Sequence, residues 1–407
     1  MSDSFTADFY VGNRKKLRTL FQGTAPIVIT ANGKLQKGTS DHFRLYQDGN
    51  FLYLTGINEP DIILVMDKDK EYLILPERSD GGEAFYGALD PTQLTNISGI
   101  TEVLDYKTGW KRLTSKLKKV KHVATLAPSP VYIEHYDFYT NPARAAVLSK
   151  IKEINPGLEP LDLRQHMALM RMVKQAPELA AIQQAVDIST RSFKDLKRKL
   201  PKLEHEYEVE AMLAYDFRRR GGDGIAYDTI AASGANACIM HYGTNSHPLT
   251  QGQSIMIDAG AAYKRYAADL TRVFMLGPVT KRHEQIWAAV KEVYDFAASN
   301  LKPGISIRQN ERAVEQFMGE KLRSLGLIRN VERDEIRTFF PHATSHFLGL
   351  DVHDAGDYDR PLEPGVTLTI EPGIYVPAEG IGIRLEDDFV ITEDGIRNLS
   401  AALPLDL

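Results

Sequence analysis

The sequence predicts two domains: an α/β domain over residues 1–172, and an α+β domain over residues 173–407 that contains an internal pseudo-twofold duplication. Three observations support this prediction. The chain has 407 residues, more than one core of ordinary size accommodates. Up to about residue 170, short apolar segments alternate with amphipathic ones. Beyond that point, a pair of helical segments followed by strands occurs twice in succession.

In the first domain, four apolar segments have the composition of buried strands: 27–31, 61–67, 71–77 and 122–128. Residues 13–21 and 110–120 have helical periodicity, and alternation of this kind is typical of an α/β domain with a mostly parallel or mixed sheet. The pair Gly81-Gly82 is not followed by Lys and Ser or Thr, so it is not a phosphate-binding loop. We therefore expect this domain to shape or restrict a site rather than to perform the chemistry.

The second domain begins near Pro177, a residue suited to the first turn of a helix. Its first half is expected to contain helices at 178–200 and 205–220 and strands at 227–232, 254–258 and 268–275. Its second half is expected to contain helices at 282–300 and 306–325 and strands at 366–375 and 381–391. Because sequence identity between the halves is poor, the predicted duplication rests on the order of elements alone.

The composition indicates an ordinary globular protein, with 43% hydrophobic and 25% charged residues. A net charge of -5 gives no general attraction to nucleic acid or to an anionic membrane. The basic segment 111–122 has apolar residues at helical spacing, which favours a solvated helix face. The single cysteine, Cys238, fits a reducing compartment, and the N-terminus is unlike a signal peptide. We expect a cytoplasmic protein that binds neither nucleic acid nor membrane.

Four carboxylates, Asp258, Asp269, Glu371 and Glu386, each interrupt an apolar, β-branched segment. A charge in a buried strand is costly unless something pairs with it. If the strands of each half pair antiparallel, the two acids of that half can face the same side of the sheet near each other. A pseudo-twofold arrangement would then bring all four carboxylates to one centre.

Four clustered carboxylates could not all ionise without cations between them. Two divalent ions about 3.5–4 Å apart would neutralise the group and hold a bridging water, whose lowered pKa yields a hydroxide that attacks a carbonyl at neutral pH. Three histidines, His342, His346 and His353, lie in the same part of the chain. An oxygen-rich site with one imidazole suits Mn²⁺, with Co²⁺ or Zn²⁺ as alternatives.

Other polar residues receive structural interpretations. Asp387 and Asp388 are interpreted as solvent-facing acids or salt-bridge partners. His247 is interpreted as a structural loop histidine. Cys238 is interpreted as a small buried filler, because no helix N-terminus or evident base activates it.

Several long motifs resemble those of the pita-bread metallopeptidases of family M24, and most closely those of the bacterial Xaa-Pro aminopeptidases, or aminopeptidases P. The motifs are I-D-x-G at 257–260, A-D-L-T-R-V-F at 268–274, P-H-x-x-S-H-F-L-G-L-D-V-H-D at 341–354, T-I-E-P-G-I-Y at 369–375 and G-I-G-I-R-L-E-D-D at 380–388. N-F-L-Y-L-T-G-I-N-E-P at 50–60 resembles the N-terminal domain of that family, so the resemblance covers nearly the whole chain.

The resemblance implies a dinuclear metal site with five ligands: Asp258, Asp269, His346, Glu371 and Glu386. In this family pattern Asp269 and Glu386 would bridge the two ions. Glu371 would also act as a base that assists proton removal from the bridging water.

The resemblance further implies roles for residues around the metals. His241 would stabilise the tetrahedral oxyanion, a role commonly worth a few kcal/mol. His353 would contact the peptide carbonyl and assist proton transfer, and His342 would line the proline pocket. Arg384 would support the last ligand, with Tyr375 also in a supporting role. One departure is Phe85, in A-F-Y-G, where the family carries a tryptophan that reaches into a substrate pocket.

The implied function is hydrolysis of the N-terminal Xaa-Pro bond by a metal-bridging hydroxide, with peptides carrying proline at the second position as substrates and a homodimer or homotetramer as the assembly. One alternative is a prolidase restricted to Xaa-Pro dipeptides, which the segment 51–60 disfavours. The other is a binding module that kept the pita-bread fold and lost the metals. Retention of every ligand and the absence of an acidic tail argue against this last alternative.

Overall fold

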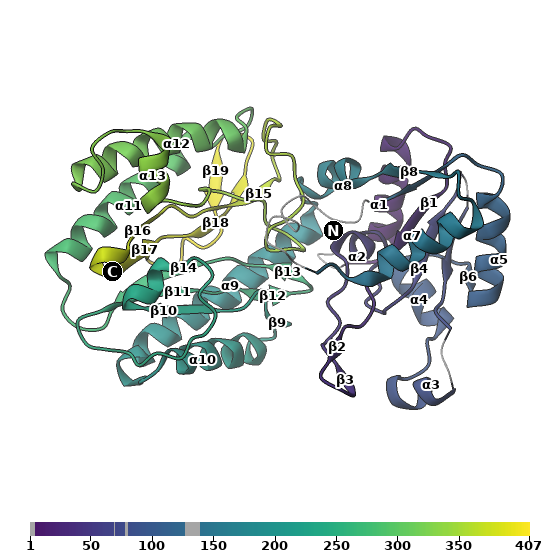
Figure 1. Cartoon of the computed structure of the whole chain (residues 1–407), viewed down its shortest axis with the longest axis horizontal. Helices are drawn as coiled ribbons and strands as arrows, with labels where there is room; N and C mark the ends of the chain where they lie inside the picture. The colour runs from purple at the N-terminus through teal and green to yellow at the C-terminus, as the bar shows by residue number, and fades with distance from the viewer. Residues whose placement is uncertain (1–4, 69, 78–79, 127–138) are drawn as a thin grey trace. The chain divides into compact units, whose positions relative to one another are not determined.

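The computed structural model describes residues 5–68, 70–77, 80–126 and 139–407 (Figure 1). The chain divides into two compact units, Met1–Met170 and Arg171–Leu407. The boundary expected from the sequence, between residues 172 and 173, lies two residues beyond this division. Among the helices of the described residues, none combines the length and the apolar character that a membrane crossing requires.

The first unit contains a six-stranded sheet in the order β6-β5-β4-β1-β7-β8. Its strands are β1 Ile27–Thr30, β4 Ile63–Met66, β5 Glu71–Ile74, β6 Val103–Leu104, β7 His122–Thr125 and β8 Glu159–Asp162. Because β4 pairs antiparallel with both β1 and β5 while the other pairs are parallel, the sheet is mixed, as predicted. The end of the predicted strand 122–128, at 127–128, lies outside the described residues. Two short strands, β2 Gln36–Lys37 and β3 Asp41–His42, pair separately.

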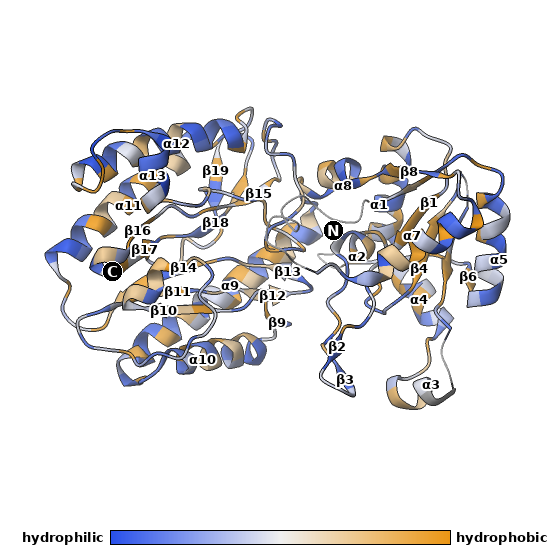
Figure 2. Cartoon of the chain, in the orientation of Figure 1, coloured by the Kyte–Doolittle hydropathy of each residue, from blue (hydrophilic) through white to orange (hydrophobic). Residues whose placement is uncertain are grey.

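The helices of this unit are α1 Ala7–Leu20, α2 Gly49–Thr55, α3 Asp80–Tyr86, α4 Pro91–Ser98, α5 Tyr106–Leu117, α7 Pro142–Ile154 and α8 Arg164–Arg171, the last of which ends at the first residue of the second unit. The buried strands β1 and β4 are the most hydrophobic ribbons of the unit in Figure 2. Trp110 and Leu113 of α5 pack in one core cluster with Val28 and Val65 of these strands. The predicted helix 110–120 is therefore amphipathic in the expected sense, with its apolar residues buried.

The second unit repeats one order of elements, a helix pair followed by strands, which confirms the predicted duplication. Its helices are α9 Ala176–Lys199, α10 Glu206–Arg219, α11 Lys281–Asn300, α12 Ile307–Ser324 and α13 Arg333–Phe339. The strands of the first half are β9 Gly224–Ile225, β10 Ile230–Ser233, β11 Ser254–Asp258, β12 Ala261–Tyr263, β13 Tyr266–Ala267 and β14 Thr271–Met275. Those of the second half are β15 Thr367–Ile370, β16 Gly373–Val376, β17 Ile381–Arg384, β18 Asp387–Ile391 and β19 Ile396–Asn398. In Figure 1, α9 and α10 lie on one side of the strands and α11 to α13 on the other.

The first half contains the antiparallel pairing expected around Asp258. β11 pairs antiparallel with both β10 and β14, and Asp258 lies opposite Thr271. The connection from β11 to β14 contains a further hairpin, β12–β13. Gly260 lies in this connection directly before β12, and a Cβ there would lie 1.7 Å from the carbonyl oxygen of Ala268, so only glycine permits this close approach.

The second half corrects one prediction, because the long strands 366–375 and 381–391 are both interrupted. β15 ends before Glu371 and β17 ends two residues before Glu386. Pro372 follows Glu371 and has no N–H for a sheet ladder, which explains the first interruption. In the first half, Asp269 likewise precedes β14. Three of the four predicted acids therefore lie at strand breaks, and Asp258 is the last residue of its strand.

Candidate metal centre

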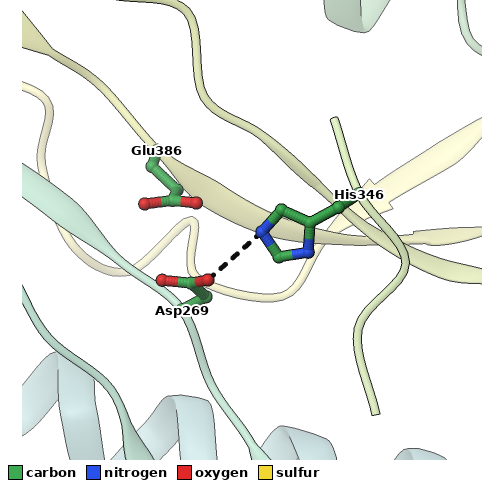
Figure 3. A group of neighbouring side chains, drawn as sticks. All are labelled: Asp269, His346 and Glu386. Atoms are coloured by element: carbon green, nitrogen blue, oxygen red, sulfur yellow. Dashed lines mark ion pairs between the residues drawn. The ribbon is translucent and has the colours of Figure 1, made fainter. Parts of the chain in front are cut away.

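Three ligand-type side chains from distant parts of the second unit meet at one buried point. Their ligand atoms all lie within 4.8 Å of one another: a carboxylate oxygen of Asp269, a ring nitrogen of His346 and a carboxylate oxygen of Glu386. Figure 3 shows the three side chains directed toward one another, with the ion pair between His346 Nε2 and Asp269 Oδ2 at 3.3 Å. All three residues are buried. The donor set, two carboxylates and one imidazole, is suited to a divalent metal ion.

The other two predicted ligands lie beside this group. His346 Nε2 is 3.4 Å from Glu371 Oε1, so it faces two carboxylates at once. Asp258 is linked to Asp269 through Tyr227, whose hydroxyl lies within hydrogen-bond distance of Oδ1 of both acids and shares its one hydrogen between them. All five residues predicted as ligands therefore gather at one centre.

The ring of His346 is oriented for metal binding. Its Nδ1 lies 3.0 Å from the carbonyl oxygen of Phe347, an acceptor that requires an N–H at this position. In the neutral ring, Nε2 then carries the lone pair, and Nε2 is the nitrogen that faces Asp269 and Glu371. A hydrogen bond of this kind sets the tautomer of a metal-binding histidine.

The electrostatics of the centre show excess negative charge. Burial, and then repulsion from Asp269 and Glu371, raises the pKa of Glu386 well above its usual value. Burial raises the pKa of Glu371 to about 7, against the opposing effect of His346. Burial also raises the pKa of Asp269. Burial alone would lower the pKa of His346, but the carboxylates of Asp269 and Glu371 outweigh this effect and raise it to about 9.

Arg384 is the cation next to these acids. Its guanidinium forms an ion pair with Asp258 and donates a hydrogen bond of 3.1 Å to Thr271 Oγ1, which in turn donates one of 2.7 Å to Glu386 Oε2. One guanidinium and one imidazole do not balance four carboxylates, of which three are buried and Glu371 is half-buried. Bound divalent cations would remove this imbalance, so the residues present fit a metal group.

His342 is hydrogen-bonded through both ring nitrogens. Nδ1 lies 2.8 Å from the carbonyl oxygen of Ala343, and Nε2 lies 2.7 Å from the hydroxyl of Tyr375. The Tyr375 hydroxyl also accepts a hydrogen bond from Arg384 Nη1. Burial, together with the charge on Arg384, lowers the pKa of His342 to about 3, so the ring is neutral at physiological pH. The neutral ring of His342 is therefore held in place beside Glu371, whose Oε2 lies 3.7 Å from His342 Nδ1.

His353 and His241 lie on the accessible side of the centre. The ring of His353 meets that of His346 edge to face, with centroids 4.3 Å apart. Partial desolvation and the neighbouring His346 lower the pKa of His353 to about 4. His241 is exposed, follows the 3-10 helix η2 (Gly234–Cys238), and acts electrostatically on both His342 and His353. Phe85 belongs to α3 of the first unit and is 84% exposed.

Two acids next to Glu386 have a different environment from the one expected. Asp387 is buried, forms an ion pair with Arg272 at 2.7 Å and accepts a hydrogen bond from Ser400. Asp388 is fully buried and accepts a hydrogen bond of 3.0 Å from the backbone N–H of Asp269. The interpretation of Asp387 as a salt-bridge partner is thus confirmed. The alternative interpretation, a solvent-facing position, is wrong for both acids.

Two polar residues that connect the predicted ligands, Tyr227 and Thr271, were not predicted from the sequence. Tyr227 hydrogen-bonds both acids of the first half. Thr271 joins the halves, since it forms a bridge with Glu386 and hydrogen-bonds its side chain. A signal for Thr271 was present in the A-D-L-T-R-V-F motif, whereas the expected strand 227–232 contained no signal for Tyr227. Cys238, expected to be a buried filler, is half-buried, with Sγ 3.4 Å from the carbonyl oxygen of Ile381.

Known proteins share both the sequence pattern and the fold. The model of metallopeptidase family M24 matches residues 180–393, and that of the aminopeptidase P N-terminal domain matches residues 10–124. The chain belongs to metallopeptidase family M24. Membership makes it a hydrolase, and its second unit contains the pita-bread fold of that family.

The chain is 30% identical to the Xaa-Pro aminopeptidase of Escherichia coli strain K12, over 99% of this chain and 96% of that protein. Two solved structures of E. coli aminopeptidase P, one with the inhibitor Pro-Leu and one zinc-substituted in complex with product, each superpose with a TM-score of 0.85. Each is 29% identical and covers 98% of this chain and 96% of the solved chain. The similarity thus includes both units.

Proposed function

We propose that this metallopeptidase is an aminopeptidase with a dinuclear metal site that hydrolyses the N-terminal Xaa-Pro bond of peptides. The observation that carries the proposal is the convergence of Asp258, Asp269, His346, Glu371 and Glu386 on one buried centre with excess negative charge. Support for the substrate class comes from the full-length similarity to an Xaa-Pro aminopeptidase and to a structure that holds the dipeptide Pro-Leu.

These five residues would hold two divalent ions, with Asp269 and Glu386 contributing to both. When bound, the ions would supply a hydroxide nucleophile at neutral pH and neutralise the carboxylates. The oxygen-rich donor set favours Mn²⁺, with Co²⁺ or Zn²⁺ as alternatives. The zinc-substituted relative is consistent with a site that accepts more than one divalent metal.

Glu371 is proposed to receive the proton of the attacking water. Its carboxylate lies beside His346 Nε2 at 3.4 Å, so it adjoins the place where the metal-bound water would be held. A general base must lie within hydrogen-bond reach of the proton it accepts. Arg384 would neutralise part of the negative charge of the neighbouring acids through its ion pair with Asp258.

Three other histidines near the metal centre are proposed to face the substrate. His241 would donate a hydrogen bond to the oxygen that becomes negative in the tetrahedral intermediate. His353 has a pKa of about 4, so its neutral ring can donate an N–H to the peptide carbonyl and relay a proton toward the leaving proline nitrogen. His342, held neutral between Ala343 and Tyr375, would form a wall of the proline pocket.

The first experiment is product analysis of Mn²⁺-loaded protein with Arg-Pro-Pro and Gly-Pro side by side. Release of free arginine from the tripeptide is the expected result and establishes aminopeptidase P activity. Cleavage of Gly-Pro alone would identify a prolidase. If metal is bound and neither peptide is cleaved, the proposal is wrong and the chain has another peptide specificity or a binding role.

Assembly and location stay predictions. We propose a homodimer or homotetramer, as expected from the family resemblance, and light scattering at micromolar concentration that returned a monomer would contradict it. A cytoplasmic location is favoured by the single cysteine, because a reducing compartment keeps Cys238 as a thiol. Fractionation of the producing cells tests this location.

A further inference from the structure

The loop that carries His241 is attached on both sides of this histidine to one buried carboxylate, that of Glu206. We call residues 233–247 the His241 loop. Glu206 is the first residue of α10 and is fully buried. On the N-terminal side of His241, Glu206 Oε1 accepts hydrogen bonds from Ser233 N at 2.8 Å, Ser233 Oγ at 2.7 Å and Asn236 Nδ2 at 3.1 Å.

The second oxygen of Glu206 holds the other side of the loop. Oε2 accepts a hydrogen bond of 2.8 Å from the hydroxyl of Tyr242, the residue directly after His241. It also accepts one of 2.9 Å from the backbone N–H of His247. Five donors therefore converge on one carboxylate, and His241 lies in the chain segment between them.

A buried carboxylate is costly to desolvate unless hydrogen bonds compensate, and Glu206 has such compensation. Burial alone would raise its pKa, but the donors from Ser233, His247 and Tyr242 outweigh this effect and lower the pKa below the usual value of a glutamate. Its place at the start of α10 adds the favourable field of a helix N-terminus. The group therefore stays charged, and its hydrogen bonds to the loop are of the strong, charge-assisted kind.

The opposite face of the loop packs against β17, which leads into Arg384. A Cβ on Gly382 would lie 2.2 Å from the carbonyl oxygen of Ala237, so the backbones of η2 and β17 are in direct contact. Cys238 Sγ contacts the carbonyl oxygen of Ile381 on the same strand. The loop is thus confined between β17 and the carboxylate of Glu206, with His241 at its exposed turn.

We propose that Glu206 is a positioning residue that fixes His241 against the substrate carbonyl. The inference rests on the proposed role of His241 in the reaction. Glu206 acts through the loop: its hydrogen bonds reach Ser233, Asn236, Tyr242 and His247. A displacement of about 1 Å in a group that stabilises the transition state can cost up to about 100-fold in rate.

The test is a double-mutant cycle of Glu206→Gln with His241→Ala, measured as kcat and KM on Arg-Pro-Pro with metal content determined for each variant. Glutamine has the same shape but replaces one acceptor oxygen by an NH₂ group, so one side of the loop loses its acceptor. In the otherwise unchanged chain, Glu206→Gln is expected to lower kcat about tenfold, with KM and metal content unchanged. In the His241→Ala background the same substitution is expected to have no further effect.

The control is Glu208→Gln in the same turn of α10. Glu208 accepts hydrogen bonds from the backbone N–H groups of Glu204 and His205, which lie outside the His241 loop. The kcat of Glu208→Gln is therefore expected to stay within about twofold of that of the unchanged chain. Hydrogen–deuterium exchange gives a direct structural measure. Exchange at the amides of Ser233 and His247 should accelerate in Glu206→Gln and not in Glu208→Gln.

If Glu206→Gln does not fold, Tyr242→Phe is the second variant, because it removes only one hydroxyl from the carboxylate. A decrease of about threefold in kcat that vanishes in the His241→Ala background is expected. Effects of Glu206→Gln or Tyr242→Phe that multiply with that of His241→Ala would overturn the positioning role and leave the proposed function intact. Full activity of His241→Ala would instead overturn the role of His241, and the inference with it.

Discussion

Two clusters of buried charge in the second unit differ in how their charges are balanced. We call Asp258, Asp269, Glu371 and Glu386 the acid centre, and Arg171, Lys174, Glu178 and Asp354 the paired cluster. In the acid centre, burial and mutual repulsion raise the pKa of Glu386 well above its usual value. In the paired cluster, burial would also raise the pKa of Asp354, but Arg171 and Lys174 lower it below the usual value.

The contacts explain the difference. Asp354 is fully enclosed, with one oxygen in an ion pair with Arg171 and the other 2.9 Å from Lys174 Nζ. The acid centre instead contains four carboxylates with Arg384 and His346 as the nearby cations. The protein therefore supplies both counter-charges of Asp354 by itself, whereas Arg384 and His346 are too few to balance the four carboxylates of the acid centre. Excess buried charge of this kind indicates a functional site rather than a stabilising element.

The largest effect is expected when the acid centre loses its proposed bridging ligand. Glu386→Gln should lower kcat by at least about 1000-fold and reduce bound metal, because the amide is a poor bridging ligand and the rate depends on several kcal/mol of metal assistance. Elemental analysis of dialysed protein and peptide hydrolysis measure the two quantities. Glu379→Gln, at an exposed ion pair with Arg282, is the matched control and should keep both. Full metal content and full activity of Glu386→Gln would exclude it from the ligand set.

The next effect concerns the paired cluster and stability. Asp354→Asn should lower the free energy of unfolding by about 3–5 kcal/mol, because Arg171 and Lys174 lose the buried carboxylate that they share, while Arg171 retains its ion pair with Asp351. Urea unfolding measures it. Asp359→Asn removes an exposed ion pair with Arg308 and should cost less than about 1 kcal/mol. Equal costs for the two variants would contradict the contrast between buried and exposed pairs.

A pH dependence is expected from Glu178 of the paired cluster. Burial raises its pKa to about 7, in spite of Lys174, while its side chain accepts hydrogen bonds from Tyr266 and the backbone of Gln175. Because the folded pKa exceeds the unfolded one, the folded state retains a proton longer, so this contribution to stability is complete at low pH and is lost as the pH rises from about 4 to about 7. At pH 8, the free energy of unfolding of Glu178→Gln should be on the order of 3 kcal/mol higher than that of the unchanged chain. The difference should vanish near pH 4, and a gain that is independent of pH would contradict the assignment.

The smallest expected effect is a change in the free energy of unfolding that has opposite signs in the two clusters. In metal-free protein, Glu386→Gln should raise the free energy of unfolding by about 1–2 kcal/mol at pH 8, because it removes a repelled buried carboxylate. Asp354→Asn lowers stability under the same conditions, so opposite signs are expected for one acid-to-amide change. Saturating Mn²⁺ should reverse the order for Glu386→Gln, since only the unchanged chain gains the full stabilisation from bound metal. Destabilisation of both variants without metal would show that the acid centre is balanced by the protein alone.

The sequence alone predicted the chemistry of the site. Acids that interrupt apolar segments are costly unless they serve a site, and their number predicted a metal centre without any coordinates. The order of elements predicted both units and the duplication, because hydrophobic periodicity depends on local spacing. The family resemblance of the motif around His346 implied one imidazole ligand at this residue. In the structure its Nε2 faces Asp269 and Glu371, and its role as a ligand stays a prediction.

Tertiary structure decided what local spacing does not contain. Strands predicted as continuous are broken at Glu371 and Glu386, because their backbone N–H groups bond to Thr344 and Thr271 in other segments. Asp387 and Asp388 have the same local pattern as solvent-facing acids, yet both are buried, since Arg272 and the backbone of Asp269 reach them from the other half.

The same reason explains why Tyr227 and Glu206 escaped prediction. Tyr227 lies 31 residues before Asp258 and 42 before Asp269, and only the folded chain brings its hydroxyl to both carboxylates. Glu206 is an ordinary acid in the first turn of a helix until the loop around His241 folds onto it. The identity of a charged side chain is written in the sequence, but the partners that decide its ionisation and its role come from segments that meet only in the folded protein.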